Sequence, residues 1–99
     1  MIYVIVDGKE RGILFCHNKE EIDLVDKETK EKYTESHPNG TTCVIFDGEK
    51  SLGSGEAKVY HTDKFNYVKG RKYALGYALT AAGFSKSERT QVWKQYNDR

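Results

Sequence analysis

Two short phrases that each contain an Asp-Gly pair constrain the fold of this chain more than any other feature. Residues 4–10 spell Val-Ile-Val-Asp-Gly-Lys-Glu, and residues 44–50 spell Val-Ile-Phe-Asp-Gly-Glu-Lys. An Asp-Gly pair between two β-forming runs favours a tight hairpin, because both residues tolerate the positive φ angles that such turns require. The sequence therefore predicts hairpins over residues 2–16 and 41–60. A duplicated hairpin and two independent solutions to the same turn both explain the similarity of the phrases.

These hairpins place an antiparallel sheet of four to six strands in residues 1–61. The chain has 99 residues, of which 37% are hydrophobic, and this suffices for one domain with one core. Residues 18–35 fit both a short exposed hairpin and a brief helix that starts at Asn18. Residues 36–40, Ser-His-Pro-Asn-Gly, are turn formers, so we expect them to divide the sheet into two parts.

The last third of the chain changes to helical periodicity. Two rows of residues recur at helical spacing, one apolar and one small: Val68, Leu75, Leu79 and Ala82, then Gly70, Ala74, Ala78 and Ala81. We expect a helix over about residues 63–82, capped by Thr62 or Asp63 and ended by Gly83. The small row would let this helix lie close to the sheet or to another helix. In the second hairpin, Gly53 and Gly55 mark a bulge or a close backbone approach.

A second helix is predicted over residues 86–97. Ser85 and Glu88 have the spacing of a capping box, in which the serine accepts from the third helical amide and the glutamate reaches back. The apolar stripe of this helix consists of Val92, Trp93 and Tyr96. A helix of this length is marginal alone, so it must dock on the rest of the protein. The sequence thus predicts an α+β domain over residues 1–99, with two C-terminal helices packed on one face of the sheet.

The net charge of +1 conceals an asymmetry between the two parts of the chain. Residues 1–61 hold 8 basic and 12 acidic side chains, whereas residues 62–99 hold 8 and 3. No apolar run approaches the length of a membrane span, and the first residues are charged, so we expect a cytoplasmic protein. Cys16 and Cys43 both sit in apolar runs, which predicts two reduced, buried cysteines.

The residues that could carry catalysis do not form a recognisable pattern, so we expect no enzyme, metal or cofactor. Cys16, Cys43 and His61 supply a thiol and a base, but no cysteine-enzyme signature surrounds them. The three histidines are too dispersed for a metal site. Gly53-Ser54-Gly55 lacks the Lys-Ser/Thr that follows a phosphate loop.

A binding surface is the remaining prediction. Five tyrosines fall in the second half of the chain, at Tyr60, Tyr67, Tyr73, Tyr77 and Tyr96. Tyr73 and Tyr77 stand one helical turn apart beside Arg71 and Lys72, and aromatic rings mixed with arginine are common in ligand pockets and interface hot spots. These rings would serve equally well as a cover for the sheet.

The strand and helix from Gly53 to Leu79 carry two resemblances. A Gly-x-Gly strand followed by a helix with Arg71-Lys72 is similar to the last half of the double-stranded RNA-binding module, although that module's first helix has no counterpart before Thr41. The Asp63-x-Phe65 entry and the Gly70-Arg-Lys-x-Ala-Leu phrase resemble small anti-defence proteins of phages and prophages of Gram-positive bacteria. The layout is similar to the sponge proteins that counter Thoeris defence, and anti-CRISPR proteins are the second kind that fits.

The resemblance to the sponge family implies a non-enzymatic binder in the infected bacterial cell. Such a protein would sequester a cyclic nucleotide signal as a homo-oligomer, whereas an anti-CRISPR protein would block a defence effector by contact. An aromatic ring would stack on the base, and cations would meet the phosphates by charge-assisted hydrogen bonds. The implied ligand-binding residues are Phe65, Asn66, Arg71, Lys72, Tyr77 and Arg89. The alternative function is a nucleic-acid-binding phage accessory protein.

Overall fold

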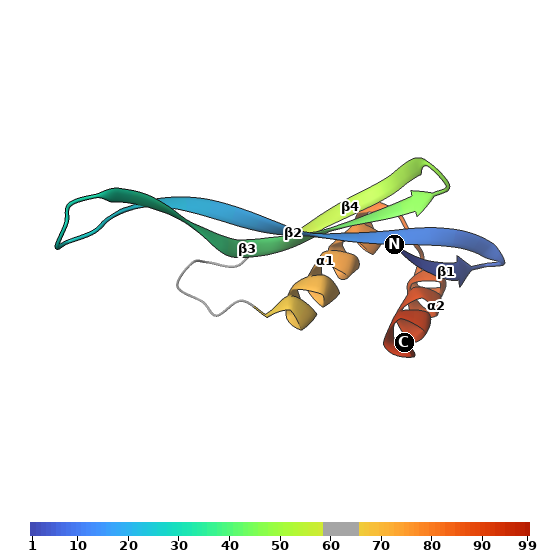
Figure 1. The fold of residues 1–99 in the computed structure, drawn as a ribbon. Helices are drawn as coiled ribbons and strands as arrows, with labels where there is room; N and C mark the ends of the chain where they lie inside the picture. Colours follow the sequence, from blue (N-terminus) through green and yellow to red (C-terminus); the bar gives the residue numbers. More distant parts are fainter. Residues whose placement is uncertain (59–65) are drawn as a thin grey trace.

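The computed structural model describes residues 1–58 and 66–99, apart from the side chains of Glu20, His37 and Pro38. The elements are β1 (Ile2–Val6), β2 (Lys9–Val25), β3 (Lys32–Asp47), β4 (Lys50–Lys58), α1 (Tyr67–Ala81) and α2 (Lys86–Asn97). The strands form one antiparallel sheet in the order β1-β2-β3-β4, and both helices lie on one face of it (Figure 1). The predicted α+β layout is confirmed.

Both predicted hairpins form, but their turns differ by one residue. Val6 pairs with Lys9, so Asp7 and Gly8 make the first loop, and both have positive φ angles, 51° and 78°. In the second hairpin Asp47 pairs with Lys50, so the loop consists of Gly48 and Glu49, and Gly48 alone has a positive φ there, 61°. The first arrangement is typical of a type I′ turn and the second of a type II′ turn.

Helix α1 lies directly against β4, which is one of the two arrangements that its small residues predict. A Cβ atom built on Gly53 would come within 2.5 Å of the amide nitrogen of Ala82, and one on Gly55 would come within 2.6 Å of the carbonyl oxygen of Ala74. The register shift between Ile45 and Phe46 also places a bulge beside Gly53. Both features predicted for the glycines, the bulge and the close approach, are therefore present.

The buried face of α1 consists of the small row and two leucines: Gly70, Ala74, Leu75, Ala78 and Leu79. Val68, which we predicted to lie on the apolar stripe, is 54% exposed, and Ala81 is exposed as well. Val68 is in the first turn of α1, beyond the part of the helix that packs on the sheet core. Those two assignments were wrong.

The start of α1 also differs from the prediction. The helix begins at Tyr67, and its N-cap is Asn66, whose side-chain oxygen accepts from the amides of Val68 (3.0 Å) and Lys69 (3.2 Å). Thr62 and Asp63, the predicted caps, lie outside the described residues. At the other end Gly83 has a φ of 76° and follows the C-cap Ala82, as expected.

Helix α2 confirms the predicted bounds and the capping box. The hydroxyl of Ser85 accepts from the amide of Glu88 (3.2 Å), and the carboxylate of Glu88 accepts from the amide of Ser85 (2.9 Å). Val92 is buried, and Trp93 and Tyr96 pack around the core cluster.

Two glutamines of α2 close the free edge of β1. Gln95 accepts from the amide of Ile5 (2.8 Å) and donates to its carbonyl oxygen (2.6 Å), while Gln91 accepts from the amide of Asp7 (2.9 Å). Covering an exposed edge with a helix is one way in which proteins prevent unwanted strand pairing.

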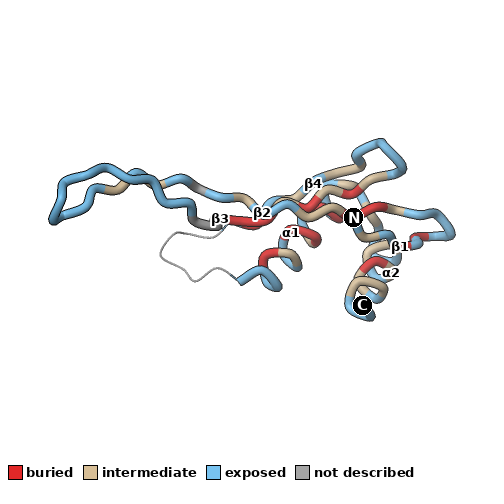
Figure 2. The backbone as a smooth tube through the Cα atoms, viewed as in Figure 1, coloured by how far each residue is buried: buried red, intermediate tan, exposed pale blue. Residues whose placement is uncertain are grey.

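The segment between the hairpins is a long β-ribbon, which we call the arm: residues 19–25 of β2 and 32–38 of β3. It makes the molecule 61 Å long and 25 Å wide (Figures 1 and 2). The hairpin alternative for residues 18–35 is confirmed, and the helix alternative was wrong. The prediction that residues 36–40 divide the sheet was also wrong, because β3 passes through them with one irregularity: Asn18 pairs with Gly40 and Lys19 with Pro38, which leaves Asn39 as the extra residue.

The two cysteines occupy opposite faces of the sheet. Cys43 is fully buried under the helices, as predicted. Cys16 is exposed, so its predicted burial was wrong; it pairs with Thr42 in a row that faces away from the helices. Among the described residues no helix is long and apolar enough to span a membrane.

Candidate functional site

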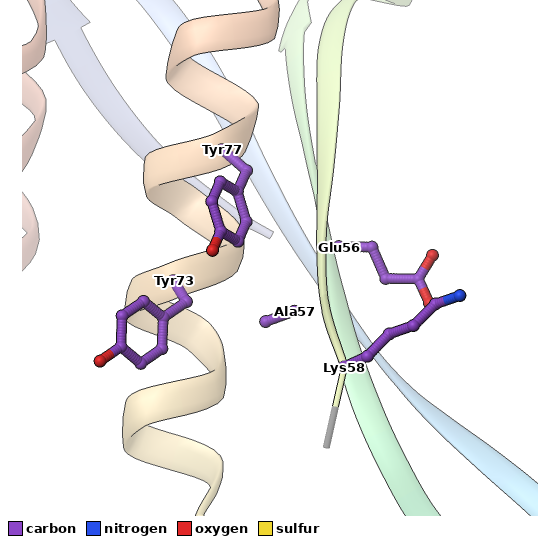
Figure 3. Close-up of a pocket in the computed structure, with 5 residues that line it drawn as sticks. All are labelled: Glu56, Ala57, Lys58, Tyr73 and Tyr77. Carbon is purple, nitrogen blue, oxygen red and sulfur yellow. The ribbon is translucent and has the colours of Figure 1, made fainter. Parts of the chain in front are cut away.

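A concavity beside two tyrosines lies between α1 and β4, and we call it the tyrosine groove. It is lined by Glu56, Ala57, Lys58, Tyr73 and Tyr77 and has a volume of about 580 Å³ (Figure 3). Tyr73 and Tyr77 follow each other by one helical turn, and their side chains are 60% and 56% exposed. Ligand pockets for small molecules typically fall between about 300 and 1,000 Å³, so the tyrosine groove has the size of one.

The packing of α1 on β4 produces this groove. Because Gly55 has no side chain, the backbone of α1 sits against β4 at Ala74 and Ala78. Tyr77 begins at the same contact, since its Cβ atom lies 2.6 Å from the position that a Cβ on Gly55 would take. The rings of Tyr73 and Tyr77 therefore lie at the side of β4 and are not covered by it.

The two walls of the groove differ in chemistry. The helix wall consists of the two phenol rings. On the strand wall, Ala57 points toward the helix, whereas the side chains of Glu56 and Lys58 point away from the tyrosines (Figure 3). The strand therefore contributes a methyl group and backbone polar groups, because alternate side chains of a strand project to opposite faces.

Among the described residues, the lining of the groove includes one carboxylate, which faces away from the rings, and neither a thiol nor an imidazole. In the described part of the chain no group of three or more potential ligands could hold a metal ion. Elsewhere, burial raises the pKa of the Cys43 thiol to about 12, so this cysteine stays protonated rather than acting as a thiolate nucleophile. The groove is suited to contact with a planar or apolar group.

The residues predicted to bind a ligand do not converge on one site. Tyr77 lines the groove, and Phe65 lies outside the described residues. The side-chain oxygen of Asn66 is used by the helix cap. Arg89 is half-buried on α2, a different element.

Arg71 and Lys72 are on α1 but outside the groove. Helical residues advance by about 100° each, so Arg71 lies about 200° around the helix from Tyr73. Lys72 is exposed and Arg71 is half-buried. Neither residue lines the tyrosine groove.

Four groove residues were not among the predicted ligand-binding residues: Glu56, Ala57, Lys58 and Tyr73. The signal that could have found them is the pair Gly55 and Ala78, since a glycine on a strand opposite a small residue on a helix indicates contact. That contact sets the rotation of α1 and brings Tyr73 and Tyr77 to the edge of the sheet.

Comparisons with protein-family models, with curated proteins and with solved structures found no match to this chain.

Proposed function

We propose that this chain is a non-enzymatic binding protein that holds a planar aromatic ligand in the tyrosine groove, and that a nucleotide is the first class to test. The observation that carries the proposal is the pair of exposed tyrosines, one turn apart, against the edge strand β4. Rings left this exposed cover little of the core, so their area is available to a ligand.

A nucleobase fits the geometry of the groove. Stacking a base on an aromatic side chain contributes about 1–3 kcal/mol, and every base offers a flat face. Residues four apart on a helix are separated by about 6 Å along its axis, so the rings of Tyr73 and Tyr77 form one extended apolar wall. Lys69 is exposed one turn before Tyr73, in position to meet a phosphate by a charge-assisted hydrogen bond.

The biological role that we propose is sequestration or inhibition during conflict between a phage and its bacterial host. This part of the proposal is supported by the phrases around Asp63, Phe65 and Gly70 that resemble phage anti-defence proteins. A sponge for a cyclic nucleotide or an ADP-ribose isomer would use the tyrosine groove directly.

Binding to a protein target is the second candidate function, and the position of β4 at the edge of the sheet favours it. The edge of β1 is closed by Gln91 and Gln95, whereas β4 is the opposite edge of the sheet and borders the tyrosine groove. An extended segment of a partner could pair with such an edge and place alternate side chains on the tyrosines. Inhibition of a defence effector by contact would follow this route.

Thermal unfolding against a panel of cyclic nucleotides, ADP-ribose isomers and short nucleic acids tests the proposal. A ligand at 100 times its Kd stabilises by about 2.7 kcal/mol, which raises the midpoint by roughly 10 °C or more in a domain of this size. We expect one small nucleotide to raise the midpoint of the wild-type protein. Tyr73→Ala and Tyr77→Ala should remove the shift, and Tyr33→Ala, an exposed tyrosine on the arm, should retain it.

Other outcomes separate the alternatives. Stabilisation by nucleic acid that falls steeply with salt would favour the RNA-binding alternative, because phosphate contacts release counterions. A flat response across the panel would contradict the nucleotide proposal and leave the protein target along β4.

A further inference from the structure

The sheet face opposite the helices is unusually apolar, and we call it the open face. Its large apolar side chains come from three strands and the N-terminus: Met1, Tyr3, Ile5, Leu14, Val44 and Phe46. Tyr3 is 62% exposed and Ile5 49%. An antiparallel sheet with helices on one face ordinarily presents polar side chains on the other, so this face departs from the usual pattern.

The strand register assigns these residues to one surface. Gly53 and Gly55 face α1, and they pair with Ile45 and Cys43, so those rows face the helices. The alternate rows face away from the helices. One of these rows contains Tyr3, Gly12 and Phe46, and the next contains Leu14, Val44 and Ser54. Directly opposite residues on neighbouring strands share a face. The sulfur of Met1 sits over Gly12, 2.7 Å from the position that a Cβ would take there, and fills the gap in the first row.

No element in the described part of the chain covers the open face. Helix α1 packs on Gly53 and Gly55 from the other side, and α2 packs on the same side through Val92 and its contacts with β1. One face of the sheet is thus covered by α1 and α2, which form the core with it, whereas no described element covers the opposite face (Figure 1).

We propose that a second copy of this chain covers the open face, with the two sheets packed face to face about a twofold axis. The two central rows, Tyr3-Gly12-Phe46-Ser51 and Leu14-Val44-Ser54, contain no charged residue. In a symmetric interface the same patch meets itself, so a patch without charge incurs no repulsion. Among the described strand residues, charges lie at its borders, at Glu10, Glu56 and Lys58.

The area of the open face is appropriate for a dimer. Three of the strands contribute about nine residues each to this face and β1 contributes five. With strands about 4.8 Å apart and a rise of about 3.3 Å per residue, the face measures roughly 500 Å² in projection. Accessible area exceeds projected area on a surface of side chains, and a stable interface needs about 800 Å² from each partner. Two sheets packed in this way lie about 10 Å apart with their inner side chains interdigitated.

Sedimentation measurements over a wide range of protein concentration test the dimer. We expect the wild-type protein to sediment at twice its mass of 11.3 kDa. Tyr3→Glu and Ile5→Glu each place a negative charge in the interface with no basic residue opposite it, since Tyr3 pairs with Gly12 and Ile5 with Glu10. Each should weaken self-association by about a hundredfold or more, because an unpaired charge would be buried. The matched controls are Tyr73→Glu and Val68→Glu on α1, which are similarly exposed but on the helical side, and they should leave the dimer intact.

The thiol of Cys16 provides a second readout. It is exposed in the row next to Leu14 and Val44, on the open face. Its rate of alkylation, followed by mass spectrometry of the labelled peptide, should fall as the wild-type dimer forms and stay constant in Tyr3→Glu. A wild-type chain that sediments as one protomer at every concentration would overturn the proposal, and so would a dimer that both open-face variants leave unchanged. Circular dichroism of each variant confirms that the fold is retained.

Discussion

Strands β2 and β3 run through two regions of the molecule, and the two regions are built differently. In the region under the helices, Ile13 pairs with Ile45 and both are 1% exposed. In the arm, Leu24 pairs with Tyr33, and none of the arm's described side chains is buried (Figure 2). The same two strands therefore continue after their core has ended.

The arm therefore depends on the covered region for its order. A two-stranded ribbon alone is marginally stable in water, because it has a backbone ladder but no apolar face to bury. Across the arm's strands, the hydroxyl of Thr34 donates to the carboxylate of Asp23 (3.1 Å), and in its turn Asp26 accepts from the amide of Glu28 (2.8 Å). Its register is set where β2 and β3 leave the core, and the free energy of unfolding should reside almost wholly in the covered region.

The largest expected effect contrasts two isoleucines of the same strand. Ile13→Ala removes a fully buried side chain and should lower the free energy of unfolding by about 2–5 kcal/mol. Ile22→Ala lies in the arm, where no other element packs on it, and should change the free energy by no more than about 0.5 kcal/mol. Urea unfolding of dilute protein measures both. Equal losses would mean that the arm contributes to the free energy of unfolding as much as the covered region does, which would contradict the proposed difference between the two regions.

Much of the covered region could be predicted from the sequence because its signals are local. The Asp-Gly pairs, the Ser85–Glu88 capping box and Gly83 each act through residues within four positions of themselves. The arm could be predicted only in part: a hairpin over residues 18–35 was one of two alternatives, but the continuation of β3 through residues 36–40 was not expected. Pairing with β2 overrides the turn preference of residues 36–40, and that pairing joins residues as distant as Lys19 and Pro38. The start of α1 was also ambiguous, since Thr62, Asp63 and Asn66 are all good caps.

The same distinction between local and long-range signals applies to the candidate site. Residue type drew attention to Arg71 and Lys72, but the rotation of α1 decides which side chains meet β4. That rotation depends on the contact between Gly55 and the backbone around Ala78, which joins distant parts of the chain. The sequence therefore indicated Tyr77 as a binding residue without indicating the strand that faces it.

The second effect compares two glycines and tests the close packing of α1. Gly55→Ala places a methyl group against Ala74, Tyr77 and Ala78 and should lower the free energy of unfolding by about 1–3 kcal/mol. Gly76→Ala places a methyl group 3.9 Å from the Trp93 ring, an ordinary contact, in the interior of a helix. It should raise the free energy of unfolding by about 0.5–1 kcal/mol.

The two glycine variants carry the same chemical change, so opposite signs would isolate the effect of the helix–strand contact. Thermal unfolding measures both. A neutral Gly55→Ala would show that α1 can move away from β4, and the tyrosine groove would then have no fixed width.

The third comparison distinguishes the two faces of the covered region through the pH dependence that each cysteine contributes. Burial raises the pKa of the Cys43 thiol from 9.0 to about 12. The unfolded chain therefore releases this proton above pH 9, whereas the folded protein retains it until about pH 12. Because the unfolded state then binds fewer protons, the free energy of unfolding should fall by about 1.4 kcal/mol per pH unit within that window, and this group contributes no pH dependence below it.

Cys43→Ala should remove this slope, while Cys16→Ala, on the open face, should keep it. Lysines and tyrosines that titrate in the same range contribute equally to all three proteins, so the comparison of slopes, measured by urea unfolding in the presence of a reductant, isolates the buried thiol. An identical slope in Cys43→Ala and in the wild-type protein would mean that water reaches Cys43, and that the layer between α1 and the sheet is less closed than the contacts of Gly53 and Gly55 require.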